Sequence, residues 1–153
     1  MNSTLKISIR YGLSTAFSLI AYFLVLRLFD LHENPWLRVF NGIIMSLGIY
    51  YSIKYYKLSS GQKFDFINGY KTGIVTGILA TAVFTLFMAI YMFHLDVEFS
   101  EQILSDWFSD YGVGVNILIF IVILEGIASS IVLTLGFMQF FKTSNNPKAK
   151  SEA

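Results

Sequence analysis

The sequence predicts an all-α, polytopic membrane protein with four transmembrane helices in a bundle and a short amphipathic interfacial helix between helices three and four. Long apolar runs are the first reason, since 55% of the residues are apolar and only 14% are charged. The second reason is that nine of the eleven basic residues lie in segments that four spans would place on one side of a bilayer. These nine are Lys6, Arg10, Lys54, Lys57, Lys63, Lys71, Lys142, Lys148 and Lys150. Insertion retains Lys and Arg on the cytoplasmic side, so both termini are expected in the cytoplasm.

The first span is expected at about residues 11–29, between Arg10 and the turn that precedes Pro35. A basic start before an apolar run is also typical of a cleaved signal peptide. The run is long for a signal peptide, and no small-residue cleavage site appears before Pro35, so we interpret it as a retained helix.

The second span is expected at about residues 36–56, where Pro35 suits the entry to a helix. Its uncharged part is shorter than the ~20 residues that a bilayer usually requires. We therefore expect Arg38 and Lys54 to extend from its two ends toward the headgroups.

The third and fourth spans are expected at about residues 70–94 and 113–139, which together hold one acidic residue and one basic residue. Between them, Phe99, Ile103, Trp107 and Phe108 recur at helical spacing, which predicts an amphipathic helix on the outer surface of the membrane. Residues 1–142 then form one domain, and residues 143–153 are expected to be a disordered cytoplasmic tail.

Small residues recur every four positions in the third span and, over a shorter stretch, in the fourth. Such a ladder lets another helix backbone approach closely, and packing contacts drive helix association in lipid. Two interpretations stay open: contact between helices of one chain, or an interface with a second copy or a membrane partner. The expected packing residues are Gly69, Gly73, Gly77, Gly126 and Ser130.

Glu125 is an acidic residue about twelve positions from either end of the fourth span. A charge near the middle of a bilayer is costly, so we expect Glu125 to face the inside of the bundle, protonated or hydrogen-bonded. It would then either join helices as a neutral acid or take part in proton transfer. The expected polar site comprises Glu125, Ser18, Ser46, Thr81 and Thr85, with Tyr50 as a further candidate partner.

Several classes of function lack support in the sequence. No phosphate-binding loop, hydrolase elbow, zinc-protease motif or dinucleotide fingerprint occurs, so we expect no enzyme, no catalytic residue and no cofactor. The i, i+4, i+7 spacing of His94, Glu98 and Glu101 is compatible with metal binding but unspecific, and we expect no metal. The basic residues suit lipid headgroups, and we expect the bilayer rather than nucleic acid as a partner.

The chain resembles the family known as domain of unknown function 4199, whose members look like small four-helix proteins of the bacterial inner membrane. Three segments carry the resemblance, over roughly residues 5–142: Gly48–Lys57, Phe64–Gly77 and His94–Phe99. The last often reads Asp-Pro-x-Phe in the family, and this chain has Val97 in place of the proline. The resemblance implies a fold and a location, but no activity and no site residues.

Three functions are compatible with these features. The first is a small non-catalytic membrane protein that associates through its helices with itself or with a membrane partner. The second is an oligomeric proton or small-solute transport unit that uses Glu125. The third is an outer-face binding module that uses the acidic segment Asp96–Asp110.

Overall fold

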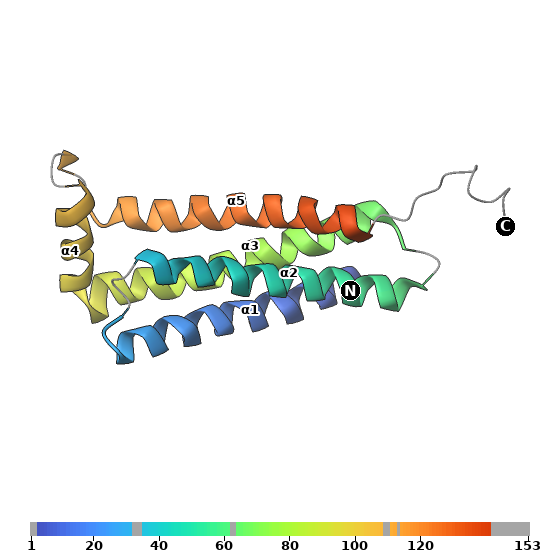
Figure 1. Ribbon diagram of the computed structural model, residues 1–153, viewed down its shortest axis with the longest axis horizontal. Coiled ribbons are helices and arrows are strands. Elements are labelled where there is room, and N and C mark those ends of the chain that lie inside the picture. Colours follow the sequence, from blue (N-terminus) through green and yellow to red (C-terminus); the bar gives the residue numbers. More distant parts are fainter. Residues whose placement is uncertain (1–2, 32–34, 62–63, 109–110, 113, 142–153) are drawn as a thin grey trace, which may run out of the picture.

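In the part of the chain that the structure describes, four long helices lie side by side, and a shorter fifth helix crosses one end of them (Figure 1). The computed structural model describes residues 3–31, 35–61, 64–108, 111–112 and 114–141. The elements in chain order are α1 (Ser3–Leu28), the 3₁₀ turn η1 (Pro35–Arg38), α2 (Val39–Ser60), α3 (Phe66–Ile90), the π-helical turn η3 (Tyr91–Leu95), α4 (Val97–Phe108) and α5 (Asn116–Phe141). The expected tail, residues 143–153, lies outside the described residues.

Three of these helices are long and apolar enough to cross a membrane. They are Thr4–Leu28, Phe66–Leu95 and Asn116–Phe141, and their length and composition indicate a membrane protein. The second expected span is helical, but α2 is not among the three, and it carries Lys54 and Lys57 within its last two turns.

The helix boundaries differ from the expected spans where local chemistry overrides hydropathy. Residues 36–38 belong to the 3₁₀ turn η1, so α2 begins only at Val39. At the other end, α2 continues to Ser60 and stops at Gly61, whose φ of 52° favours glycine. Asp65 then caps α3, because its carboxylate accepts hydrogen bonds from the backbone N–H groups of Ile67 and Asn68.

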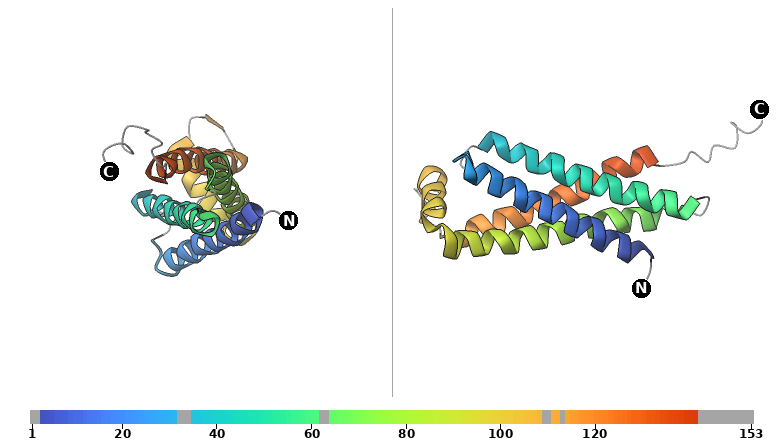
Figure 2. Two further views of the ribbon diagram at one scale, coloured as in Figure 1. Left: turned by 90° about the vertical axis from the view of Figure 1, so that its right-hand side faces the viewer. Right: turned by 90° about the horizontal axis from the view of Figure 1, so that it is seen from below.

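The core is divided into two clusters along the length of the helices. The right-hand view of Figure 2 shows the long helices lengthwise, with α4 across one end of them. One cluster, which we call the ladder core, combines aliphatic and small residues of all four long helices. Its buried members are Ala16, Met45, Ile49, Ile53, Ala80 and Met138. The other, the aromatic core, lies next to α4, and its buried members are Phe23, Met88, Tyr91, Met92, Phe99 and Leu118.

The junction between α3 and α4 is a π-helical turn closed by the half-buried carboxylate of Asp96. The N–H of Asp96 donates to the carbonyl of Tyr91 at 2.9 Å, and the Tyr91 hydroxyl donates to the Asp96 carboxylate at 2.8 Å. The same carboxylate accepts from the N–H of Phe99 at 3.1 Å, which caps α4, and it pairs with Arg27 of α1 at 2.9 Å. Asp96 therefore ties α1, η3 and α4 together.

Candidate binding cavity at the α4 end

The glycine ladder of α3 packs against the small residues of α5 within the chain. Each step of four residues up α3 is matched by a step of four residues down α5. The facing pairs are Gly69 with Met138, Gly73 with Thr134, Gly77 with Ser130, and Thr81 with Gly126. A Cβ atom built at Gly77 would lie 2.6 Å from the Cβ of Ser130, closer than real side chains approach. Of the two open interpretations, the structure shows the contact within one chain.

A cavity begins where this ladder ends. Beyond Thr81 and Gly126, the facing side chains of α3 and α5 are larger, among them Phe84, Met88 and Leu118. They border a space of about 300 Å³, and α1 and the start of α2 complete its walls. A volume of this size falls within the range of small-molecule sites.

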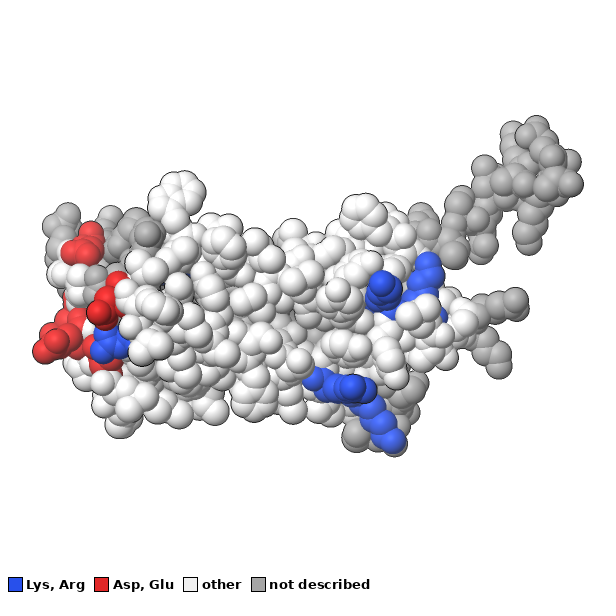
Figure 3. Space-filling model, turned by 60° about the horizontal axis from the view of Figure 1, so that its bottom comes forward, with Lys and Arg blue, Asp and Glu red and all other residues white. Residues whose placement is uncertain are grey.

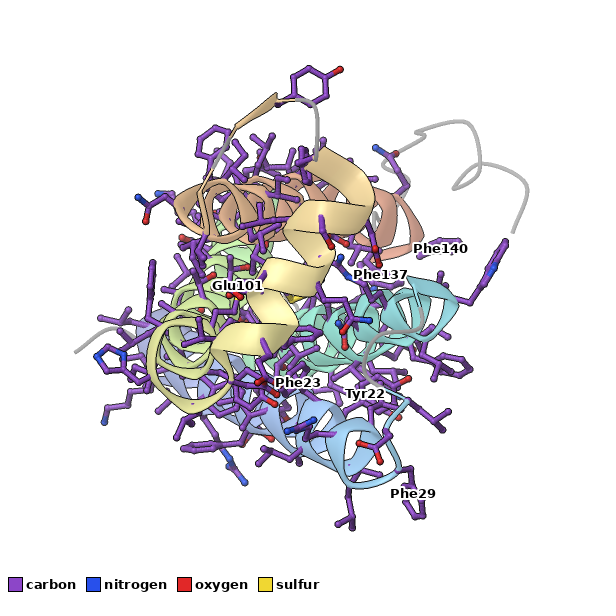
Figure 4. All side chains as sticks on the ribbon, turned by 90° about the vertical axis from the view of Figure 1, so that its left-hand side faces the viewer. Tyr22, Phe23, Phe29, Glu101, Phe137 and Phe140 are labelled. Carbon is purple, nitrogen blue, oxygen red and sulfur yellow. The ribbon has the colours of Figure 1, made fainter. Side chains whose placement is uncertain are left out.

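Helix α4 covers this cavity with its apolar face. Phe99, Ile103 and Phe108 line the cavity, whereas Glu98 and Glu101 are exposed. In the end-on view of Figure 4, α4 crosses the ends of the long helices, with Tyr22 and Phe23 of α1 close to its lower part. The amphipathic helix is therefore present as expected, but much of its apolar face points toward the other helices. The side chain of Trp107 lies outside the described residues.

Aromatic contacts hold α4 in this position. The Phe23 ring lies 4.9 Å from the Tyr91 ring and 6.1 Å from the Phe99 ring, both in edge-to-face geometry. Such pairs contribute about 0.5–1.5 kcal/mol each beyond the burial of their area. Together with Asp96, they fix one end of α4 to α1 and η3.

A smaller hollow of about 70 Å³ adjoins the cavity. The two spaces share the side chains of Arg38, Asn41, Phe84 and Val122. Two buried oxygens in the wall of the hollow, Oδ1 of Asn41 and Oγ1 of Thr81, accept or donate no hydrogen bond among the described residues. Buried polar atoms are nearly always satisfied in proteins, and these two are exceptions; both are fully buried, so neither is open to the hollow.

Glu125 lies at the edge of this hollow and pairs with Arg38. Its Oε2 is 3.5 Å from a guanidinium nitrogen of Arg38, and the two side chains are 58% and 49% exposed. The expectation that Glu125 is buried among the helices is therefore wrong. Its depth also differs, because α5 begins at Asn116 and ends at Phe141, which places Glu125 nearer the α4 end.

Only part of the expected polar site is brought together. Thr81 and Glu125 border the same hollow, whereas Ser46 and Thr85 line neither space. Ser18 is exposed and donates to the carbonyl of Ser14, in its own helix, at 2.9 Å. Tyr50 packs against the rings of Phe137 and Phe141 at the opposite end.

Arg38 and Asn41 are the site residues that sequence reasoning missed. Arg38 was expected to extend toward the headgroups, and no role was expected for Asn41. The hydroxyl of Tyr22 donates to the carbonyl of Leu37 at 2.9 Å, which ties η1 to α1 and places Arg38 beside the cavity. Arg38 and Asn41 are three residues apart at the start of a helix, which puts them on one face. This spacing could have identified them as a pair of polar residues facing the same space.

The residues considered for metal binding do not share a helix face. His94 lies in η3, while Glu98 and Glu101 lie in α4, which begins after the break at Asp96. No group of three His, Asp or Glu side chains suitable for a metal ion is found in the described part of the chain.

A family model described as a protein of unknown function matches residues 10–110. The matched segment runs from α1 to the end of α4 and stops before α5, so it is shorter than the resemblance read from the sequence. No curated protein and no solved structure matches the chain. The chain belongs to the family called domain of unknown function 4199.

Proposed function

We propose that this protein is a four-span integral protein of the bacterial inner membrane, with a bundle of α1, α2, α3 and α5 and with both termini in the cytoplasm. The distribution of charge supports this orientation. Basic residues gather at the end opposite α4, and acidic residues gather at the α4 end (Figure 3). Since insertion keeps basic residues inside, α4 lies on the outer side.

Reporter fusions test this arrangement. Alkaline phosphatase, which is active only outside the cytoplasm, is expected to be active when fused after Phe108 and inactive when fused after Gly61 or Phe141. Activity after Gly61 would show that α2 does not cross the membrane, and activity after Phe141 would reverse the proposed orientation.

Within this arrangement, the protein acts without catalysis by binding a largely apolar molecule in the cavity beneath α4. The observation that supports this function is the cavity of about 300 Å³, walled by the long helices and covered by α4. Ligand sites in membrane and soluble proteins alike are mostly apolar spaces with a few polar groups. Helix association through the glycine ladder, the first function expected from the sequence, has less support because α5 already occupies that ladder.

A cavity-filling substitution tests this function, and α5 offers a matched control. Val122→Phe places a larger side chain in the wall of the cavity, whereas Val132→Phe makes the same change where the side chain is 67% exposed. Protein in lipid nanodiscs is labelled with adamantyl diazirine, a small apolar photoreagent, and labelled residues are mapped by mass spectrometry.

We expect Val122→Phe to reduce labelling of Met88 and Leu118 several-fold, and Val132→Phe to leave it unchanged. Labelling of the exposed Leu124 serves as the internal reference. Equal labelling of Met88 and Leu118 in both variants would remove the cavity as a binding site.

Proton or solute transport is a second candidate, favoured by the Arg38–Glu125 pair at the edge of the hollow. Intramembrane ion pairs commonly lie on ion pathways. In this case Glu125→Gln abolishes a pH-driven flux in reconstituted vesicles. The candidate is dropped if the wild-type protein gives no flux, or if the variant gives the same flux.

A further inference from the structure

We propose that the cavity beneath α4 is filled from the side, by a lipid-soluble molecule that leaves the hydrocarbon of the bilayer and passes between α2 and α5. The inference rests on the proposed binding function and on the four-span arrangement. It adds the route of entry, and with it the class of ligand, a molecule that resides in the membrane. The entrance is the hollow of about 70 Å³, which shares Arg38, Asn41, Phe84 and Val122 with the cavity.

Helices α2 and α5 meet over the half of the bundle that lies away from α4. The Tyr50 ring of α2 lies 5.4 Å from the Phe137 ring of α5. Nearer the middle, both helices pack over Gly77 of α3. A Cβ built at Gly77 would lie 2.6 Å from the Cβ of Ser130 and 3.2 Å from the Cδ1 of Ile49. These contacts close the space between α2 and α5 along this stretch.

The hollow lies between the same two helices on the side nearer α4. Gly42 and Met45 of α2, Thr81 of α3 and Gly126 of α5 contribute to its wall. Met45 and Thr81 are buried, whereas Gly42 is exposed, so the hollow runs from the surface of the bundle toward its interior. No atom of the described residues lies within 4 Å of the point where a Cβ of Gly42 would stand. In the right-hand view of Figure 2, α2 and α5 cross, and their ends next to α4 lie apart.

The hollow opens at the depth of the membrane hydrocarbon. Thr81 lies at the middle of the 30-residue segment Phe66–Leu95, which is long enough to cross a bilayer. Gly126 lies about 15 Å along α5 from Asn116, at about 1.5 Å per residue. Because the hydrocarbon core of a bilayer is about 30 Å thick, both residues lie well inside it. A molecule that enters here therefore comes from the lipid chains rather than from water.

A pair of opposite charges borders the entrance. Arg38 of η1 and Glu125 of α5 both line the hollow and lie 3.5 Å apart, with side chains 49% and 58% exposed. Charged side chains at membrane depth are rare, and they commonly mark the path of a substrate or ion. The hollow is much smaller than the cavity, so a ligand passes only when the entrance widens. Exposed ion pairs are weak, which lets this one separate and form again readily.

The competing route, past α4, is obstructed by stronger contacts. Asp96 caps α4 and pairs with Arg27 of α1 at 2.9 Å. The Phe23 ring of α1 also packs edge-to-face against the Phe99 ring of α4. Entry past this end of α4 requires these contacts to break, whereas entry between α2 and α5 requires an exposed ion pair to separate.

A lipid probe that cannot leave the bilayer tests the route. Phosphatidylcholine with a diazirine on one acyl chain is incorporated into nanodiscs with the full-length protein and illuminated, and labelled residues are mapped by mass spectrometry. We expect labels on Met45 in the hollow and on Met88 in the cavity. Both side chains are buried, so acyl chains that stay outside the bundle do not reach them. The exposed Leu124 serves as the internal reference.

Two glycines give a matched pair of variants. Gly42→Trp places a large ring at the entrance, whereas Gly136→Trp makes the same change at an exposed position of α5. At neither glycine does an atom of the described residues lie within 4 Å of the position of a Cβ, so both variants are expected to fold. We expect Gly42→Trp to reduce the labelling of Met45 and Met88 several-fold, and Gly136→Trp to leave it unchanged. If Gly42→Trp does not fold, Gly42→Leu and Gly136→Leu replace the pair.

Separating the ion pair is expected to have the opposite effect. Glu125→Ala removes the partner of Arg38 and so weakens the contact across the entrance. Labelling of Met45 and Met88 is expected to rise about two- to fivefold, the change in population that corresponds to the loss of one exposed ion pair. Glu98→Ala, at an exposed position of α4, is the control and should change neither label. Unchanged labelling in Glu125→Ala would overturn the closing role of the pair.

The outcomes separate this inference from the function on which it rests. If adamantyl diazirine labels Met88 but the phosphatidylcholine probe does not, the cavity is retained and lateral entry is overturned. Equal labelling by the lipid probe in Gly42→Trp and Gly136→Trp would overturn the hollow as the entrance. Asp96→Asn loosens α4, and a larger rise in this variant than in Glu125→Ala would place the entrance beneath α4 instead. If neither probe labels Met88, the binding function itself fails.

Discussion

The two ends of this protein pack the same helices in different ways. Toward the basic end, α3 and α5 approach closely because glycine, serine and threonine face one another in register from Gly73 to Thr81. Toward α4, phenylalanine, methionine and leucine replace them and enclose about 300 Å³ of space. Small residues bring backbones together and leave little room, whereas large side chains hold the helices apart. The change of residue size along α3 therefore separates a scaffold from a site.

The largest expected effect on stability comes from disrupting the close contact between α3 and α5. Gly77→Leu forces α3 away from Ser130 and is expected to destabilise the protein by about 3–4 kcal/mol, at the upper end of overpacking costs. Gly136→Leu is the control, because no atom lies within 4 Å of the position where its Cβ would stand. Thermal unfolding in detergent measures both, and equal melting temperatures would contradict the internal role of the ladder.

The same truncation at the two ends sharpens the comparison. Ile49 is fully buried in the ladder core, and Ile49→Ala is expected to cost about 3 kcal/mol. Ile121 borders the cavity, so part of its side chain already lacks neighbours, and Ile121→Ala is expected to cost about 1 kcal/mol. Chemical denaturation measures the difference. Similar costs would show that the α4 end is as closely packed as the rest.

Releasing α4 is expected to affect only the cavity end. Asp96→Asn weakens the pair with Arg27 and the bond from the Tyr91 hydroxyl, at an expected cost of about 2 kcal/mol. Amide hydrogen exchange should then become faster in α4 and stay unchanged in α3 near Gly73 and Gly77. Glu98→Gln, on the exposed side of α4, is expected to change neither region. Faster exchange throughout the chain would show that the two ends unfold together.

The smallest expected effect lies at the basic end of α2. Lys57 donates to the carbonyl of Phe141 at 3.2 Å and lies 5.5 Å from the Phe141 ring and 5.6 Å from the Phe64 ring. Lys57→Met removes these contacts at an expected cost of about 0.5–1 kcal/mol. Lys54→Met, which loses only a contact with the Tyr50 ring, serves as the comparison. A larger loss for Lys54→Met would show that Lys57 does not link α2 to α5.

The sequence by itself determined the helices and the membrane as their environment. Long uncharged runs locate most helix ends to within a few residues, because hydrocarbon requires backbone groups to be satisfied within each span. The start of the first helix is the exception: it was expected near residue 11, but α1 begins at Ser3, because a helix can continue through Lys6 and Arg10 outside the apolar run. The four-residue spacing from Gly69 to Gly77 also identified a close helix contact, since the spacing alone puts these glycines on one face. The spacing does not decide whether the partner helix belongs to the same chain or to another one.

The tertiary structure alone decided what each face meets. Glu125 faces Arg38 at the edge of a hollow, because α2 starts late, after a 3₁₀ turn, and because α5 is offset toward α4. Asn41 of α2 and Thr81 of α3 line the same hollow although forty residues separate them in the chain. The rotation and the offset of each helix depend on how all the side chains pack together, so hydropathy along the sequence does not predict them. The cavity therefore became visible only in three dimensions.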